Sequence, residues 1–127
     1  MAGGIRVLLM DDEEVILGMA RELLKRLGCA VAVARRGEDA LEAYRSALSS
    51  GEPFDVVILD LTIAGGMGGI ETIQKLRKLD GTIRAVVSSG YAEDPAMEKP
   101  EEYGFMGVVK KPYRIRDLKS VLGRVMS

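Results

Sequence analysis

The sequence predicts an α/β protein in which five parallel strands form one sheet with helices packed on both faces. Short runs rich in valine, isoleucine and leucine alternate five times with segments that repeat apolar residues at helical spacing. Most of these runs lack the polar alternation of a half-solvated strand, which favours parallel strands buried on both faces. In a chain of 127 residues, this (βα)5 order favours a doubly wound sheet with strand order 2-1-3-4-5.

The expected strands are the apolar runs themselves. They lie at 5–10, 30–34, 54–60, 83–89 and 106–110. The first expected helix, 14–27, places Val15, Met19, Leu23 and Leu27 at steps of four, and Gly28 follows as a stop. We expect Met10, Met19 and Met106 to fill the core.

The remaining expected helices span 37–49, 69–79 and 114–126, each with apolar residues at helical spacing. The segment 92–104 is a weaker helix, because Pro100 would break a helix that began near Pro95. A short helix with Pro100 in its first turn and Gly104 at its end fits this segment better.

Composition limits the function. The chain is 47% hydrophobic and 29% charged, with a net charge of -1 and a single cysteine. We therefore expect one domain, 1–127, that contacts neither nucleic acid nor membrane, in the reducing cytoplasm, with Cys29 buried. The chain has no histidine, which excludes a Ser-His-Asp mechanism and a histidine-ligated zinc site. Oxygen atoms would hold any metal.

Polar side chains follow four of the five strands. They are Asp11, Asp12 and Glu13 after the first strand, Asp60 after the third, Ser88 and Ser89 after the fourth, and Lys110 and Lys111 after the fifth. In the order 2-1-3-4-5 these strand ends are neighbours, at the edge where open α/β sheets bind ligands. Carboxylates this close repel one another, and Mg²⁺ would relieve that repulsion.

This set of groups suits phosphoryl transfer. A carboxylate such as Asp60 can attack phosphorus, and the transfer needs positioning and charge stabilisation more than a strong base. The glycine-rich loop "TIAGGMGG" after Asp60 lets backbone amides approach phosphoryl oxygens. From the residues alone, Ser88 or Ser89, and Lys110 or Lys111, could reach this site.

The segments "MDDEE", "ILDLTIAGGMGG", "VVSSGYA" and "KKP", in this order and spacing, are characteristic. The chain resembles the receiver domain of two-component response regulators over nearly its whole length, and the resemblance implies a flavodoxin-like fold. It implies that Asp60 is the phosphoacceptor, that Ser89 is the switch hydroxyl, and that Lys111 pairs with the phosphate before a cis Lys111–Pro112 bond. It also implies Mg²⁺ as cofactor. The implied metal ligands are Asp11, Asp12, Asp60 and the backbone carbonyl of Thr62.

The resemblance implies partners as well. A sensor histidine kinase or a histidine phosphotransfer protein would donate the phosphoryl group. Phosphorylation would switch the face formed by the fourth helix, fifth strand and fifth helix, through which the domain could also form a homodimer. We expect either a stand-alone receiver or a piece of a longer kinase or regulator.

Three features depart from the usual receiver pattern. The loop after Asp60 is one residue longer and lacks a proline, as in receivers of hybrid sensor histidine kinases, which this chain resembles. Val108 occupies the position that often holds a switch aromatic, and Tyr91 could take part of that role. Pro100 interrupts the fourth helix.

Three other functions are alternatives to this interpretation. A degenerate receiver that acts as a phosphorylation-independent interaction module is the main alternative. A magnesium-dependent phosphohydrolase of the haloacid dehalogenase type would need a second aspartate where Thr62 stands. A flavodoxin-like cofactor binder would need a phosphate-binding loop where "DDEE" repels phosphate.

Overall fold

The computed structural model describes residues 4–127. The elements run, in chain order, β1 (Arg6–Met10), α1 (Glu14–Arg26), β2 (Ala30–Ala34), α2 (Gly37–Ser49), β3 (Val56–Asp60), α3 (Gly69–Leu79), β4 (Ala85–Ser89), α4 (Pro95–Glu98), the 3₁₀ helix η1 (Pro100–Tyr103), β5 (Gly107–Lys110) and α5 (Ile115–Met126). Among these residues, no helix has the length and apolar character needed to cross a membrane.

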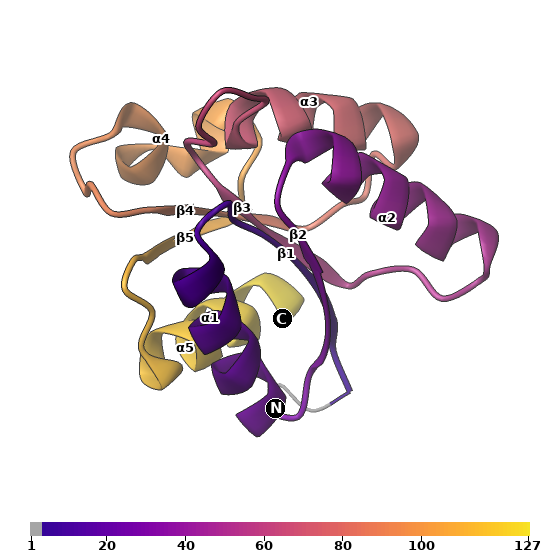
Figure 1. Ribbon diagram of the computed structural model, residues 1–127, viewed down its shortest axis with the longest axis horizontal. Coiled ribbons are helices and arrows are strands. Elements are labelled where there is room, and N and C mark those ends of the chain that lie inside the picture. Colours follow the sequence, from indigo (N-terminus) through magenta and orange to yellow (C-terminus); the bar gives the residue numbers. More distant parts are fainter. Residues whose placement is uncertain (1–3) are drawn as a thin grey trace.

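The sheet confirms the predicted fold class. The strand order within the described chain is β2-β1-β3-β4-β5, and every neighbouring pair is parallel. Helices α1 and α5 cover one face of the sheet, while α2, α3 and α4 cover the other (Figure 1). This arrangement places the carboxyl ends of β1, β3, β4 and β5 next to one another, so the residues that follow these strands share one edge.

The core consists of two apolar layers, one on each face of the sheet. The layer under α1 and α5 contains Leu24, Ile58 and Leu122, whereas the layer under α2 and α3 contains Tyr44, Leu59 and Ile73. Every residue of β3 and β4 is buried. The edge strand β2 is more exposed, so the expectation of burial on both faces holds for the central strands only.

Helix α1 forms as predicted, but the apolar stripe that marks it in the sequence does not face the sheet in its first half. Val15 is 75% exposed and Met19 is 50% exposed, and the helix instead buries Leu17, Ala20 and Leu24. Residues at steps of four advance by about 40° per step around a helix of 3.6 residues per turn, so such a stripe drifts across the surface. Only its later members, Leu23 and Leu27, therefore reach the core layer.

The expectation that three methionines fill the core is wrong for two of them. Met10 is fully buried in β1, whereas Met19 and Met106 are about half exposed. Met106 lies immediately before the edge strand β5, where one side of the chain has no neighbouring strand to cover it.

The segment after β4 contains two short helices instead of one. Proline has no amide hydrogen and restricts the residue before it to extended backbone, and Lys99 accordingly leaves the helical region between α4 and η1. The predicted short helix with Pro100 in its first turn is η1. It ends at Gly104, whose φ of 92° is a left-handed conformation that glycine adopts without strain.

Candidate functional site

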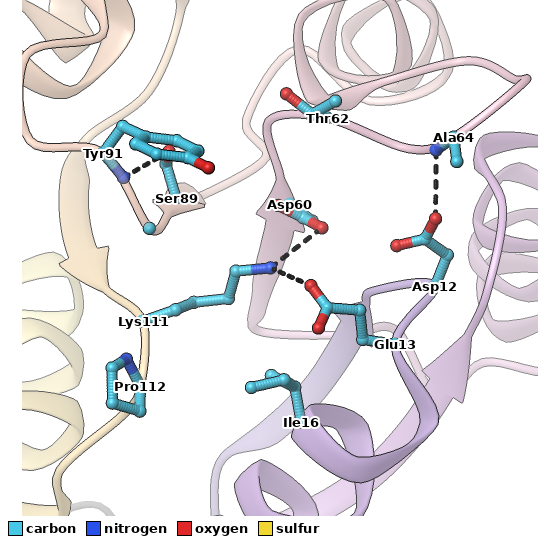
Figure 2. Close-up of a pocket in the computed structure, with 11 residues that line it drawn as sticks. Asp12, Glu13, Ile16, Asp60, Thr62, Ala64, Ser89, Tyr91, Lys111 and Pro112 are labelled. Carbon is cyan, nitrogen blue, oxygen red and sulfur yellow. Dashed lines mark hydrogen bonds and ion pairs between the residues drawn. The ribbon is translucent and has the colours of Figure 1, made fainter.

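A pocket of 580 Å³ lies at the carboxyl edge of the sheet (Figure 2). Its walls come from the segments that follow β1, β3, β4 and β5. The lining residues are Asp12, Glu13, Ile16, Asp60, Thr62, Ala64, Ser89, Gly90, Tyr91, Lys111 and Pro112. The pocket therefore forms where the sequence predicted that the polar strand ends would meet.

Lys111 joins two of the carboxylates. Its ammonium Nζ lies 3.1 Å from Asp60 Oδ2 and 3.1 Å from Asp11 Oδ2, and it donates a hydrogen bond to each. A third carboxylate, that of Glu13, lies 3.5 Å away (Figure 2). The Lys111 side chain is only 11% exposed and those of its two aspartate partners are nearly buried, so solvent screens these charges weakly.

Three aspartate carboxylates form a cluster at this edge of the sheet. One oxygen atom from each of Asp11, Asp12 and Asp60 lies within 4.8 Å of the others. Backbone amides orient two of the acids: the Glu13 N–H donates to Asp11 at 2.9 Å, and the Ala64 N–H donates to Asp12 at 3.0 Å. Because Lys111 bonds two of these three aspartates and supplies a single positive charge, the cluster keeps excess negative charge. An all-oxygen cluster of this kind suits a hard divalent cation.

The buried position makes Asp60 unusual. Burial, followed by the negative charge of Asp11, raises the pKa of Asp60 to about 6, although Lys111 opposes both effects. Burial acts to lower the pKa of Lys111, but the carboxylates of Asp60 and Asp11 outweigh it and raise that pKa. Lys111 is therefore a fixed cation, and Asp60 is an ionised carboxylate at neutral pH with an unfavourable environment.

The structure shows which of the two adjacent serines, and which of the two adjacent lysines, reaches the pocket. Ser89 lines the pocket, whereas the Ser88 hydroxyl is buried and lies 2.5 Å from the Tyr113 hydroxyl. Lys111 reaches the carboxylates, whereas Lys110 is exposed on β5. The Lys111–Pro112 peptide bond is cis, as the resemblance implied.

The loop after Asp60 packs closely against the end of β3. A Cβ atom at Gly68 would lie 2.5 Å from the carbonyl oxygen of Leu61, and one at Gly69 would lie 2.8 Å from that of Asp60. These contacts are shorter than any side chain tolerates. Glycines at 68 and 69 therefore let the chain turn back over Asp60, a steric role that the sequence alone does not reveal.

Several residues at the site escaped the sequence analysis. Tyr113 holds Ser88 and packs in the core layer under α1 and α5. Asp94 accepts a hydrogen bond from the Ser89 hydroxyl at 2.7 Å. Nothing in the spacing distinguishes Asp94 from the neighbouring exposed acids, so only the fold reveals this contact.

Thr62 and Tyr91 both lie at the pocket, as the resemblance implied. Thr62 lines the pocket, and its backbone N–H donates to the Asp60 carboxylate, although a metal-binding role for its carbonyl remains an expectation. Tyr91 also lines the pocket but is 67% exposed. Val108 is partly buried against the core layer under α2 and α3, where it offers no hydroxyl.

Comparisons with known proteins agree with this geometry. The sequence profile of the response regulator receiver domain matches residues 7–123. The chain is 35% identical to ethylene receptor 2 of Arabidopsis thaliana over 97% of its own length and 16% of the receptor. It is 26% identical to sporulation initiation phosphotransferase F of Bacillus subtilis, with 95% of this chain and 93% of that protein aligned.

A solved structure shows the same fold. The chemotaxis protein CheY4 of Vibrio cholerae superimposes with a TM-score of 0.84 at 25% identity, over 95% of this chain and 98% of that one. The chain belongs to the response regulator receiver domain family of two-component systems. It spans only 14–17% of the length of the ethylene receptors that it matches.

Proposed function

We propose that this domain is a phosphoacceptor switch in which Asp60 receives a phosphoryl group from a phosphohistidine of a partner, with Mg²⁺ bound. Receiver domains interact with histidine kinases or histidine phosphotransfer proteins. The observation that carries the proposal is the contact of Lys111 with both Asp60 and Asp11 beside a third carboxylate, Asp12. This arrangement provides an acceptor, a cation for the phosphate and an acidic metal site in one pocket.

The acidic cluster fits the metal. Asp11, Asp12 and Asp60 offer carboxylate oxygens close together, and we propose the Thr62 carbonyl as the remaining protein ligand. When bound, Mg²⁺ would neutralise the carboxylates and the incoming phosphoryl oxygens.

The chain's own residues supply the rest of the chemistry. A carboxylate oxygen of Asp60 attacks phosphorus, the phosphorus–nitrogen bond to the donor imidazole breaks, and the imidazole keeps the electron pair and takes a proton from solvent. Lys111 is already 3.1 Å from the attacking carboxylate, so it can pair with a phosphoryl oxygen without a large movement. The mixed anhydride that forms can be hydrolysed, which resets Asp60.

We propose that phosphorylation is transmitted through Ser89 to the face formed by α4, β5 and α5. Ser89 ends β4, and Lys110 on β5 is its direct neighbour in the sheet register. A hydroxyl that moves toward a phosphoryl group on Asp60 would shift the start of the following segment. The same face is our candidate for homodimer formation. Cys29 is buried, which fits the reducing cytoplasmic setting that we propose.

The test is phosphoryl uptake. The protein is incubated with Mg²⁺ and either acetyl phosphate or beryllofluoride, beside Asp60→Asn, and intact mass and beryllofluoride binding are measured. We expect one added phosphoryl group, and Mg²⁺-dependent binding, in the wild type but not in the variant. A folded wild-type protein that takes up neither would contradict the proposal and favour a phosphorylation-independent interaction module.

A further inference from the structure

The single proton of the Ser89 hydroxyl is donated to Asp94. Its oxygen Oγ accepts a hydrogen bond from the backbone N–H of Tyr91 at 3.0 Å and donates one to Asp94 Oδ2 at 2.7 Å. A serine hydroxyl carries a single proton. While that proton is donated to Asp94, it cannot be donated to an oxygen on or near Asp60.

No neighbouring serine can replace it. Ser88 is fully buried and its hydroxyl lies 2.5 Å from Tyr113. A phosphoryl group on Asp60 that needs a hydroxyl from β4 must therefore take it from the Ser89–Asp94 pair. A hydrogen bond to an ionised carboxylate is stronger than one between neutral groups. The free energy needed to break it is therefore subtracted from the free energy gained when the domain switches to its active arrangement.

Asp94 is also tied to the start of α4. Its backbone carbonyl accepts hydrogen bonds from Met97 at 2.9 Å and Glu98 at 3.1 Å, and its own N–H donates to the Tyr91 carbonyl at 3.3 Å. Its side chain makes no capping bond to the helix. The carboxylate therefore serves the contact with Ser89, while the backbone of the same residue begins the helix.

We propose that Asp94 is a positioning residue that holds the Ser89 hydroxyl in the unphosphorylated arrangement and competes with phosphorylated Asp60 for its proton. This inference rests on the proposed phosphoacceptor function. Phosphorylation must break the Ser89–Asp94 hydrogen bond, and the released Asp94 is the residue that immediately precedes α4. The competition therefore sets the fraction of molecules in the active arrangement, and it connects the pocket to the segment that follows β4.

The test is beryllofluoride binding at saturating Mg²⁺ in the full chain. Asp94→Ala leaves Ser89 free, so the fraction of molecules competent to bind rises, and we expect the apparent Kd to fall about three- to tenfold. Asp94→Asn keeps a weaker, neutral acceptor and should give a smaller fall. Glu93→Ala, which removes an exposed negative charge one residue away, is the matched control and should leave the Kd within about twofold.

The Ser89→Ala background separates this mechanism from a general charge effect. If Asp94 acts through Ser89, adding Asp94→Ala to Ser89→Ala should not change the Kd further. A Kd for Asp94→Ala equal to or weaker than that of the wild type would overturn the proposal, and so would an equal effect of Asp94→Ala in the Ser89→Ala background.

A second readout does not depend on phosphoryl chemistry. The Tyr91 amide donates to the same Ser89 oxygen, so its NMR resonance in the resting domain reports the hydroxyl. Asp94→Ala and Ser89→Ala should both shift it, whereas Glu93→Ala should not. Failure of the wild type to bind beryllofluoride would count against the proposed function, while an unmoved Tyr91 resonance in Asp94→Ala would count against the Ser89–Asp94 contact itself.

Discussion

At the scale of single residues, the charged groups that form the candidate site also lower the stability of the fold. Asp60 is buried next to Asp11, and Lys111 and the Thr62 backbone N–H offset the cost of its charge only in part. Folding without a metal must therefore hold two carboxylates beside one ammonium in a place with little water. Groups that are kept in an unfavourable charged state before a ligand arrives are typical of functional sites.

The cost of the Asp60 charge can be measured. We expect Asp60→Asn to raise the free energy of unfolding by about 1–2 kcal/mol at pH 7 in EDTA, because asparagine has nearly the same shape and no charge. Urea denaturation of both proteins tests this. Asp12→Asn, at a partly exposed position, should have a smaller effect. An Asp60→Asn protein no more stable than the wild type would contradict the view that this charge is unfavourable in the fold.

At the scale of elements, the close packing of α5 on β5 depends on a missing side chain. A Cβ atom at Gly107 would lie 2.8 Å from Val121 Cγ2 and 3.4 Å from Val125 Cγ1. Both valines are buried on α5. The helix therefore lies directly on the strand that leads to Lys111, and any change in this packing would alter the position of the ammonium.

We expect Gly107→Ala to lower the free energy of unfolding by about 1–3 kcal/mol, because the added methyl group overlaps Val121. Gly123→Ala is the matched control, since it lies in α5 with nothing within 4 Å of its Cβ position. That change should raise stability by about 0.5–1 kcal/mol through helix propensity. Thermal unfolding of the two variants should thus shift in opposite directions, and a stabilised Gly107→Ala would show that α5 can move away freely.

A second contact joins α2 to the end of α3. The Tyr44 hydroxyl, on a buried side chain, donates to Asp80 Oδ2 at 2.7 Å. Hydrogen bonds from Thr82, and then from Tyr44, lower the pKa of Asp80. Since the folded pKa lies below the unfolded value, this contribution to stability is present at neutral pH and is lost as the pH falls through the lowered pKa.

Tyr44→Phe should therefore cost about 1–2 kcal/mol of unfolding free energy at pH 7, and the difference from wild type should shrink as the pH falls through the lowered pKa of Asp80. Urea denaturation at several pH values measures both effects. Tyr103→Phe, at a partly buried tyrosine of η1, is the control and should show no such pH dependence. A Tyr44→Phe cost that does not shrink at any acid pH at which the protein stays folded would mean that the charge of Asp80 is not involved.

These elements also show what the sequence can reveal. The alternation of apolar runs and helical segments predicted the strand order, and the polar strand ends predicted which segments meet. The exposed side of α1 was not predictable, because a stripe at steps of four does not identify which part of it meets the sheet. The Ser89–Asp94 contact was not predictable either, since it depends on how α4 begins after a loop with no regular pattern.

At the scale of the whole molecule, the parallel sheet unites residues that lie far apart in the chain. Lys111 bonds Asp11 across 100 positions and Asp60 across 51. The register places Asp60 beside Ser88 and Ser89 beside Lys110. Because the pocket has walls from four separate strand ends, a ligand that binds there connects most of the sheet and should stabilise the fold as a unit.

Magnesium should therefore raise the melting temperature of the whole domain. A ligand at ten times its Kd that binds only the folded state adds about 1.4 kcal/mol, which corresponds to about 3–6 °C for a domain of this size. Calorimetry with increasing MgCl₂, compared with EDTA, measures the shift. Asp12→Asn should greatly reduce it, since it removes one of the three clustered carboxylates.

Glu52→Gln is the matched control for this experiment. Glu52 is exposed and lies before β3, at the opposite end of the sheet from the pocket, so its loss of one negative charge should leave the magnesium response unchanged. If Glu52→Gln reduced the shift as much as Asp12→Asn does, the ion would be responding to net charge rather than to the pocket. A wild-type melting temperature that did not change with magnesium would mean that the carboxylate cluster repels without binding the ion.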